Sequence, residues 1–270
     1  MLPSSKIVKE DAKKHLSGKW PLSIAAIMIS LFFVFFLLML FSFMGQFFTG
    51  GMPLIIVSVS VIFIGALLGF PLNLGVLRFF RYIYEDKDTS LYTVFYYFSS
   101  RRLFSKTLKL FLLLTSKIAL VALLLLLPAT ITDLLASGRL PLFADSGMPI
   151  WFSNLWVFSA FLRGIAAVIF FIIVIRHCPS LYIFIINDEL DCFEIMHLST
   201  KVSKRSAGAF IGLIFSFLGY FLISIFVVPL IFTLPIFIIS YLTHSAAAIE
   251  LYNKKIVSDN FFDNNNEFDL

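Results

Sequence analysis

The sequence from Trp20 to Leu77 reads WPLSIAAIMISLFFVFFLLMLFSFMGQFFTGGMPLIIVSVSVIFIGALLGFPLNLGVL and contains no Asp, Glu, Lys or Arg. A helix that crosses a membrane needs about 20 apolar residues, so this stretch is long enough for two crossings and a turn. Gly45-Gln46 and the run from Thr49 to Pro53 supply turn residues. We therefore predict one spanning helix on each side of this turn.

The composition of the whole chain indicates the same class of protein. Of its 270 residues, 60% are hydrophobic and 14% are charged, against about 25% charged in an ordinary soluble domain. So few charges cannot cover the surface of a water-soluble fold. This excludes a soluble globular protein, a disordered chain and a disulfide scaffold, and predicts an all-α polytopic membrane protein.

Four more spans follow, because residues 206–249 also lack Asp, Glu, Lys and Arg and two further apolar runs precede them. Pro179 should break the fourth span, and Pro229 is expected at a tight external turn. The six predicted spans cover about 22–46, 53–77, 110–132, 156–178, 207–228 and 231–250. They form one transmembrane domain over 21–252, between an amphipathic cytoplasmic segment at 1–20 and a disordered cytoplasmic tail at 253–270.

The basic residues predict the orientation. Eighteen of the 21 Lys and Arg residues lie before the first span, after the sixth, or in the connections that share that side. The exceptions are Lys117, Arg139 and Arg163. Because cytoplasmic loops carry the excess of Lys and Arg, both termini of this cell-membrane protein are expected in the cytoplasm.

Three segments on the predicted inner side look helical and are too short or too polar to span. Residues 5–17 place Val8, Ala12 and Leu16 on one face among lysines. Residues 89–99 are rich in Tyr and Phe, and residues 188–205 begin with acids and end with bases, with Asp188 as the expected N-cap. We expect these short amphipathic helices to lie on the anionic inner leaflet of the lipid bilayer; docking surfaces for a partner protein are the alternative.

Three ionisable residues fall within or at the ends of predicted spans: Lys117, Asp133 and Arg163. Such residues are functional candidates, because an isolated charge in hydrocarbon is costly. Lys117 is close enough to the inner end of its helix to reach the interface. Asp133 and Arg163 both lie near the outer side, and we favour a structural ion pair between them over a substrate site.

Two spans carry small residues four positions apart. Gly65 and Gly69 lie in the second span, and Gly208 and Gly212 in the fifth. This spacing lets two helices approach closely. We favour packing inside one bundle, with the interface of a homo-oligomer as the alternative.

No pattern in the chain points to a reaction. It contains no phosphate-binding loop, no G-x-S-x-G and no H-E-x-x-H. His177, Cys178, Cys192 and His197 do not have the spacing of a zinc site, and the acids from Asp188 to Glu194 are what the start of a helix favours. We therefore expect no enzyme, no cofactor or metal, and no nucleic-acid partner.

Several short motifs occur together in a familiar order. They are Ala12-x3-Leu16-x-Gly18-x-Trp20, Pro71-Leu72-x-Leu74-Gly75 with Phe79-Phe80, Ser199-x4-Lys204 followed by Phe210 and Ser216-Phe217-Leu218-Gly219-Tyr220, and Ala246-Ala247-Ala248-x2-Leu251-Tyr252. Over about residues 8–252 the chain resembles the bacterial integral-membrane family catalogued as domain of unknown function 975. The resemblance implies six membrane helices and supplies no reaction.

Three functions are considered. A lipid-modifying enzyme would need polar residues that converge at the inner interface, and only the acids from Asp188 to Glu194 could supply them. The other two functions fit these expectations better. The first is a non-enzymatic accessory or envelope protein of the cell membrane. The second is the permease subunit of an ABC-type exporter, because an amphipathic N-terminal helix, six spans and a cytoplasmic helix between spans two and three are typical of such permeases. That function would require a separate cytoplasmic ATPase as partner.

Overall fold

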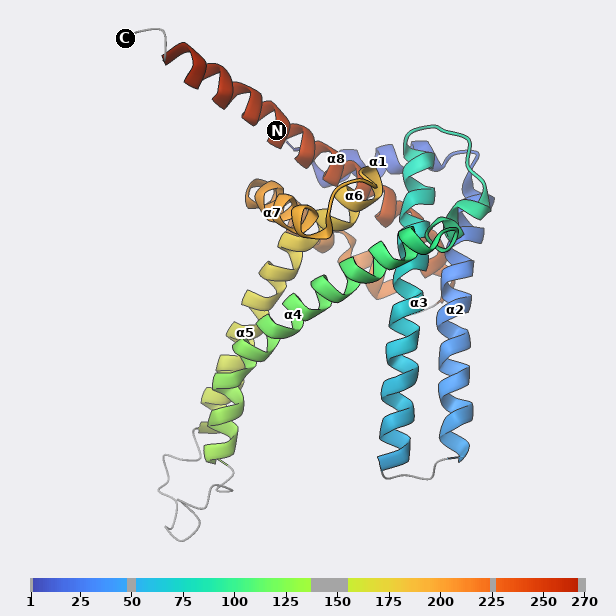
Figure 1. The fold of residues 1–270 in the computed structure, drawn as a ribbon, viewed down its shortest axis with the longest axis vertical. Coiled ribbons are helices and arrows are strands. Elements are labelled where there is room, and N and C mark those ends of the chain that lie inside the picture. The colour runs from blue at the N-terminus through green and yellow to red at the C-terminus, as the bar shows by residue number, and fades with distance from the viewer. Residues whose placement is uncertain (1, 48–51, 137–154, 224–226, 267–270) are drawn as a thin grey trace.

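The computed structural model describes residues 2–47, 52–136, 155–223 and 227–266. In these ranges the chain is helical and forms no strand. The helices are α1 (Ser5–Leu16), α2 (Trp20–Phe47), α3 (Met52–Tyr84), the 3-10 helix η1 (Leu91–Phe98), α4 (Arg101–Ala136), α5 (Leu155–His177), α6 (Pro179–Ile186), α7 (Cys192–Ile223) and α8 (Val227–Asn266) (Figure 1).

Six helical segments are long and apolar enough to cross a membrane, which confirms the predicted all-α polytopic class. They are Trp20–Met44, Ile55–Tyr84, Arg101–Leu135, Leu155–Ile186, Ser206–Ile223 and Pro229–Lys254. Four of them exceed the predicted lengths; the largest extensions at the charged ends are those of α3, which continues to Tyr84, and α4, which begins at Arg101. Lysines and arginines near a helix end extend to the interface while their stems stay apolar, so charge does not end the helix there.

Neighbouring helices pack as three hairpins, α2 with α3, α4 with α5, and α7 with α8. The first two hairpins descend and diverge from a common end at the top of the view (Figure 1). The helices α1, η1 and α6 gather at this common end. We call it the basic end, because most of the Lys and Arg residues lie on the segments that meet there.

The core of the protein sits at the basic end. Leu16, Phe79, Ile83, Tyr97 and Phe184 come from four different helices and are fully buried there. Along the divergent hairpins, by contrast, large apolar side chains face outward, as hydrocarbon-facing residues do. Contacts between the first two hairpins are therefore concentrated at one end of the molecule.

The fourth span breaks where the sequence predicts. Helix α5 ends at His177 and α6 begins at Pro179. Proline is favoured at the first position of a helix, since the N–H that it lacks would have no partner there. Helix α6 then directs its side chains into the core, where Tyr182, Ile183 and Phe184 are buried.

The start of α7 differs from the prediction. The helix begins at Cys192, and the predicted inner-face helix and fifth span form one continuous element. Asp191, not Asp188, is the cap: its Oδ2 accepts from the Phe193 N–H at 3.4 Å, and Glu194 Oε2 accepts from the Asp191 N–H at 3.1 Å. This reciprocal arrangement is a capping box.

The α7/α8 hairpin also differs from the prediction. Pro229 lies in the first turn of α8, not in an external turn. The ring of Phe232 is 5.9 Å from that of Trp20, at the start of α2, and Lys9 Nζ donates to the Ser216 carbonyl at 2.5 Å. These contacts place the part of the α7/α8 hairpin near its turn against α1 and α2. Helix α8 crosses the α2/α3 hairpin obliquely (Figure 1).

Two further expectations concern the ends of the chain. The apolar stripe of α1, Val8, Ala12 and Leu16, is buried, and α1 packs on α8. The stripe therefore covers protein, whereas the sequence suggested that it rests on the lipid leaflet. At the other terminus, α8 is helical to Asn266, beyond the boundary at 252 that composition predicts. Arg139 lies outside the described residues.

Candidate functional site at the basic end

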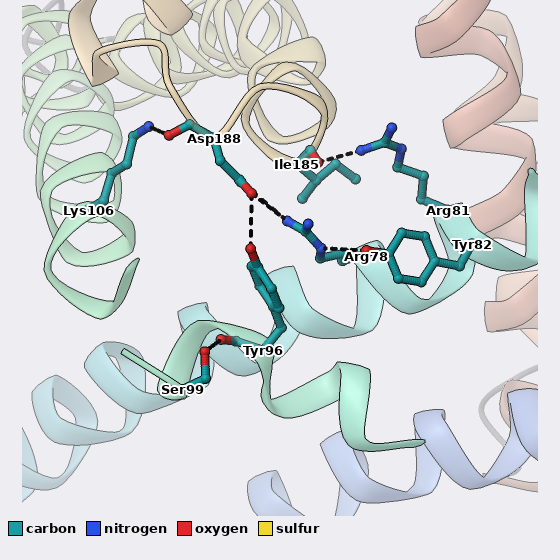
Figure 2. A network of polar contacts seen from close by, with 8 residues as sticks. All are labelled: Arg78, Arg81, Tyr82, Tyr96, Ser99, Lys106, Ile185 and Asp188. Atoms are coloured by element: carbon teal, nitrogen blue, oxygen red, sulfur yellow. Dashed lines mark hydrogen bonds and ion pairs between the residues drawn. The ribbon is translucent and has the colours of Figure 1, made fainter. Parts of the chain in front are cut away.

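A cluster of polar side chains at the basic end is the best-defined candidate site, and its centre is Asp188. Arg78 Nη1 donates to Oδ1 and Oδ2 of Asp188 at 3.2 and 3.0 Å. The Tyr96 hydroxyl donates to Oδ2 at 3.1 Å. Figure 2 shows these groups converging from α3, η1 and the connection between α6 and α7. One carboxylate therefore joins three segments.

Arg78 is enclosed by aromatic rings. Its side chain is only 11% exposed, and its guanidinium carbon lies 3.7 Å from the centre of the Tyr96 ring. Its Nε donates to the Tyr82 hydroxyl at 3.3 Å, one turn along α3. A planar guanidinium can stack on a ring and bind a carboxylate at once, which an ammonium group cannot do equally well.

Two more basic side chains bind backbone oxygens of the α6–α7 connection. Lys106 of α4 donates to the Asp188 carbonyl, and Arg81 Nη1 donates to the Ile185 carbonyl at 2.6 Å (Figure 2). The last carbonyls of a helix have no partner within the helix. Arg81 supplies one for the last turn of α6, and Lys106 one for the loop that follows it.

Helix η1 is held in place by direct backbone contact with α3. A Cβ atom added to Gly75 would lie 1.8 Å from the Val94 carbonyl oxygen. No side chain fits between them, so glycine is required at this position for η1 to dock. Val94 and Tyr97 are buried in the contact, while Tyr92 stays 76% exposed on the other side of η1.

Around the cluster, electrostatics favour the charged state of Glu85 and Asp191 and the neutral state of Tyr96 and Tyr97. Burial raises the pKa of the Tyr97 hydroxyl, and burial also raises the pKa of Tyr96. Lys109 donates to Asp191 at 2.7 Å and holds the pKa of that carboxyl below its usual value. Burial would raise the pKa of Glu85, but hydrogen bonds from Lys87 and Arg81 outweigh it and lower the pKa.

These contacts hold α3, η1 and the α6–α7 connection together. We call the cluster of Arg78, Tyr96 and Asp188 the structural joint. Both oxygens of Asp188 accept hydrogen bonds, and Asp191 and Glu194 cap α7 while Asp191 also binds Lys109. Only Glu189 of this acidic group has no described partner. Among the described residues, no group of three or more His, Cys, Asp or Glu could hold a metal ion.

The predicted intramembrane charges are not part of this cluster. Asp133 and Arg163 form the expected ion pair between α4 and α5, and the Ser159 hydroxyl donates to Asp133 Oδ1 at 2.6 Å. Lys117 is exposed on α4, eight residues beyond Lys109 and so about 12 Å farther along the helix. The structure therefore brings together two of the three residues and leaves Lys117 apart.

The predicted helix-packing glycines also separate into two groups. A Cβ atom on Gly65 would lie 2.7 Å from Leu37 Cδ1, and one on Gly69 would lie 3.4 Å from Phe33 Cε1. Both glycines thus pack against α2 within the chain. Gly208 and Gly212 face open space, with no described atom within 4 Å of the added Cβ.

Sequence reasoning missed the centre of the site. The sequence identifies Arg78 only as a basic residue after the second predicted span, and it predicts Asp188 as a helix cap. Their positions are 110 apart in the chain, and no spacing rule connects residues so far apart. The available signal was that Arg78 stands one turn before Arg81 and Tyr82, on a helix that continues past the predicted span.

Comparisons with known proteins give no relative from which a function could be inferred. No family model matches the chain, and neither a curated protein nor a solved structure matches it. The resemblance to the family of domain of unknown function 975 stays a prediction from the sequence.

Proposed function

We propose that this polytopic membrane protein is a non-enzymatic accessory or envelope component whose polar cluster acts as a structural joint. The observation that supports the proposal is that the acidic residues of the cluster are hydrogen-bonded to other parts of the protein. The carboxylate at the centre of the cluster, Asp188, accepts three hydrogen bonds from Arg78 and Tyr96. A carboxylate that already accepts these hydrogen bonds is poorly placed to move protons or to hold a metal ion.

We also propose that the basic end faces the cytoplasm of a cell membrane. The positive-inside rule supports this orientation, because 18 of the 21 Lys and Arg residues lie before the first span, after the sixth, or in the connections that share that side. The exposed lysines of α1, such as Lys13 and Lys14, would then face an anionic leaflet.

The structural role can be separated from a catalytic one by replacing the ion pair with apolar residues. A buried pair exchanged for packed apolar side chains is often neutral for stability, whereas one lone charge is costly. We expect Asp188→Leu alone to unfold the joint and Arg78→Met/Asp188→Leu to restore it. Folding is measured by thermal denaturation in detergent, and function by envelope-stress resistance in a strain lacking its own copy.

Two results distinguish the roles. Recovery of both folding and resistance in the double variant supports a joint. A double variant that folds and inserts normally but stays inactive would overturn the proposal, since it would show that the carboxylate is needed for its chemistry. Glu189→Leu, at the exposed neighbour of Asp188, is the matched control for a change of charge alone.

The second candidate function is the permease subunit of an ABC-type exporter. The exposed face of η1 favours it, because Tyr92 and Phe95 are 76% and 43% exposed at the basic end while Tyr96 ties the helix to Asp188. A partner pressing on η1 would therefore act on α3 and on the α6–α7 connection together.

Recovery of an ATPase tests this candidate. We expect the full chain, purified from its own cells in mild detergent, to bring a nucleotide-binding partner that Tyr92→Ala releases. Thr93→Ala, on the next residue of η1, is the control. If no ATPase is recovered, or if Tyr92→Ala leaves it bound, the permease function is abandoned.

A further inference from the structure

An apolar groove runs along the α2/α3 hairpin below η1, with a volume of about 370 Å³. It is lined by Ile29, Phe32, Phe33, Phe36, Leu68, Leu72, Phe95 and Phe98. The α2 part of the lining begins nine residues after Trp20, about 14 Å along the helix. The groove thus lies within spanning segments, where hydrocarbon chains are the available solvent.

Helix η1 gives the groove a rim. Phe95 and Phe98 of η1 form the edge toward the basic end. The contact between Gly75 and the Val94 carbonyl fixes the position of that helix on α3. The groove is therefore shaped by packed backbone, and its occupant meets a preformed surface.

Two arginines follow this rim directly. Arg101 and Arg102 stand three and four residues after Phe98, at the start of α4, and both are exposed. Phe104, in the same turn, stacks on Phe98 with the ring centres 5.7 Å apart. The start of α4 is therefore in contact with the rim of the groove.

These two arginines differ from the basic residues that bind the α6–α7 connection and the start of α7. Arg78, Arg81, Lys106 and Lys109 all donate to protein oxygens. No described residue pairs with Arg101 or Arg102. A guanidinium presents a fork of donors that suits phosphate oxygens, so unpaired arginines beside an apolar groove favour a ligand with a phosphate at one end and hydrocarbon at the other.

We propose that this groove binds one anionic phospholipid from the leaflet at the basic end. An acyl chain occupies the phenylalanine-lined groove, and Arg101 and Arg102 bind the phosphate and the anionic headgroup. This proposal holds whether the protein is an accessory component or a permease subunit.

The same hairpin offers a matched control. A second groove of about 370 Å³ is lined by Val34, Leu37, Leu38, Phe41, Val61, Ile62, Gly65 and Ala66. It is equally apolar, and no Lys or Arg occurs near these residues in the sequence. It should accept hydrocarbon chains without preference for a headgroup.

Photolabelling in nanodiscs tests the proposal. The full chain is placed in phosphatidylcholine discs with a small fraction of phosphatidylglycerol that carries a diazirine on its acyl chain, or of phosphatidylcholine with the same chain. Mass spectrometry then compares labelling at Phe95 and Phe98 with labelling at Val61 and Ile62. We expect the anionic probe to be preferred at η1 by about fivefold for each arginine engaged, and not at Val61 or Ile62.

The variant Arg101→Gln/Arg102→Gln should remove the preference at η1. Labelling of Phe95 by the phosphatidylcholine probe should persist in this variant, which verifies that the groove is still formed. Equal preference at the two grooves in the wild-type chain would overturn the proposal. So would a preference at η1 that the double variant retains.

Discussion

Helices α3 and α7 carry the same spacing of glycines and use it differently. Gly65 and Gly69 of α3 meet side chains of α2, whereas Gly208 and Gly212 of α7 meet open space. The spacing permits close approach, but a facing helix decides whether close approach occurs. For α3 this is packing inside the bundle, as the sequence favoured. For α7, contact with a second copy of the chain stays a proposal.

The two faces of α7 explain the difference. Phe210, Leu213 and Phe217 are buried on one side of the helix, and the helical period places Gly208 and Gly212 on the opposite side. Large residues of α7 thus pack on α8 and its neighbours, and the small residues face away. In α3 the small residues are the ones that pack.

The largest effect is expected at Gly75. Gly75→Ala places a Cβ atom against the Val94 carbonyl oxygen, so η1 must move off α3. Overpacking of this kind costs about 3 kcal/mol or more. Gly219→Ala on the open face of α7 should instead stabilise by about 0.5–1 kcal/mol, because alanine favours helix. SDS titration of the purified protein measures the free energy of unfolding of both variants. Equal changes in the two variants would contradict the difference between the packed glycine of α3 and the open glycine of α7.

The second largest loss of stability is expected when the ion pair between Arg78 and Asp188 is broken. Asp188→Asn keeps the size of the side chain but leaves the enclosed Arg78 guanidinium without its carboxylate. We expect a loss of about 2–3 kcal/mol in the free energy of unfolding. Glu189→Gln, which is exposed, should change the free energy little. A loss at Glu189 as large as at Asp188 would contradict the assignment of the joint.

The pair between α4 and α5 should matter less. Arg163 is about half exposed, so its coupling to Asp133 is expected to be about 1 kcal/mol or less. A double-mutant cycle with Asp133→Asn and Arg163→Gln measures this coupling. The double variant should be no less stable than either single variant. Strictly additive losses would show that the two residues act independently.

The smallest expected effect is a pH dependence at Glu85. Its pKa is lowered in the folded protein, so folding favours the ionised carboxylate. This contribution is complete above the unfolded value of about 4.3 and is lost as the pH falls through the lower folded pKa. Melting temperatures between pH 6 and pH 3 should fall less steeply in Glu85→Gln. Identical slopes would show that Glu85 makes no such contribution.

The spans were predictable because each is a long apolar run, and Pro179 marks the break between α5 and α6. The charge pair Asp133–Arg163 followed from two unusual residues at one depth. The joint could not be predicted in this way. Arg78 lies near the end of an apolar spanning helix, while Tyr96 and Asp188 lie on connecting segments, and only the folded chain brings the three together. Likewise, composition made the α7/α8 hairpin resemble the others, while the contacts of Phe232 and Lys9 arise from tertiary packing.

The central claim is that η1 and the α6–α7 connection lie together on the cytoplasmic side, joined through Arg78. Labelling by a membrane-impermeant maleimide tests it most directly, with Cys178 and Cys192 replaced by alanine. Ser99→Cys and Glu189→Cys should both be labelled only after the membrane is opened, whereas Arg139→Cys should be labelled in intact cells. Labelling of Ser99→Cys or Glu189→Cys in intact cells would contradict the account.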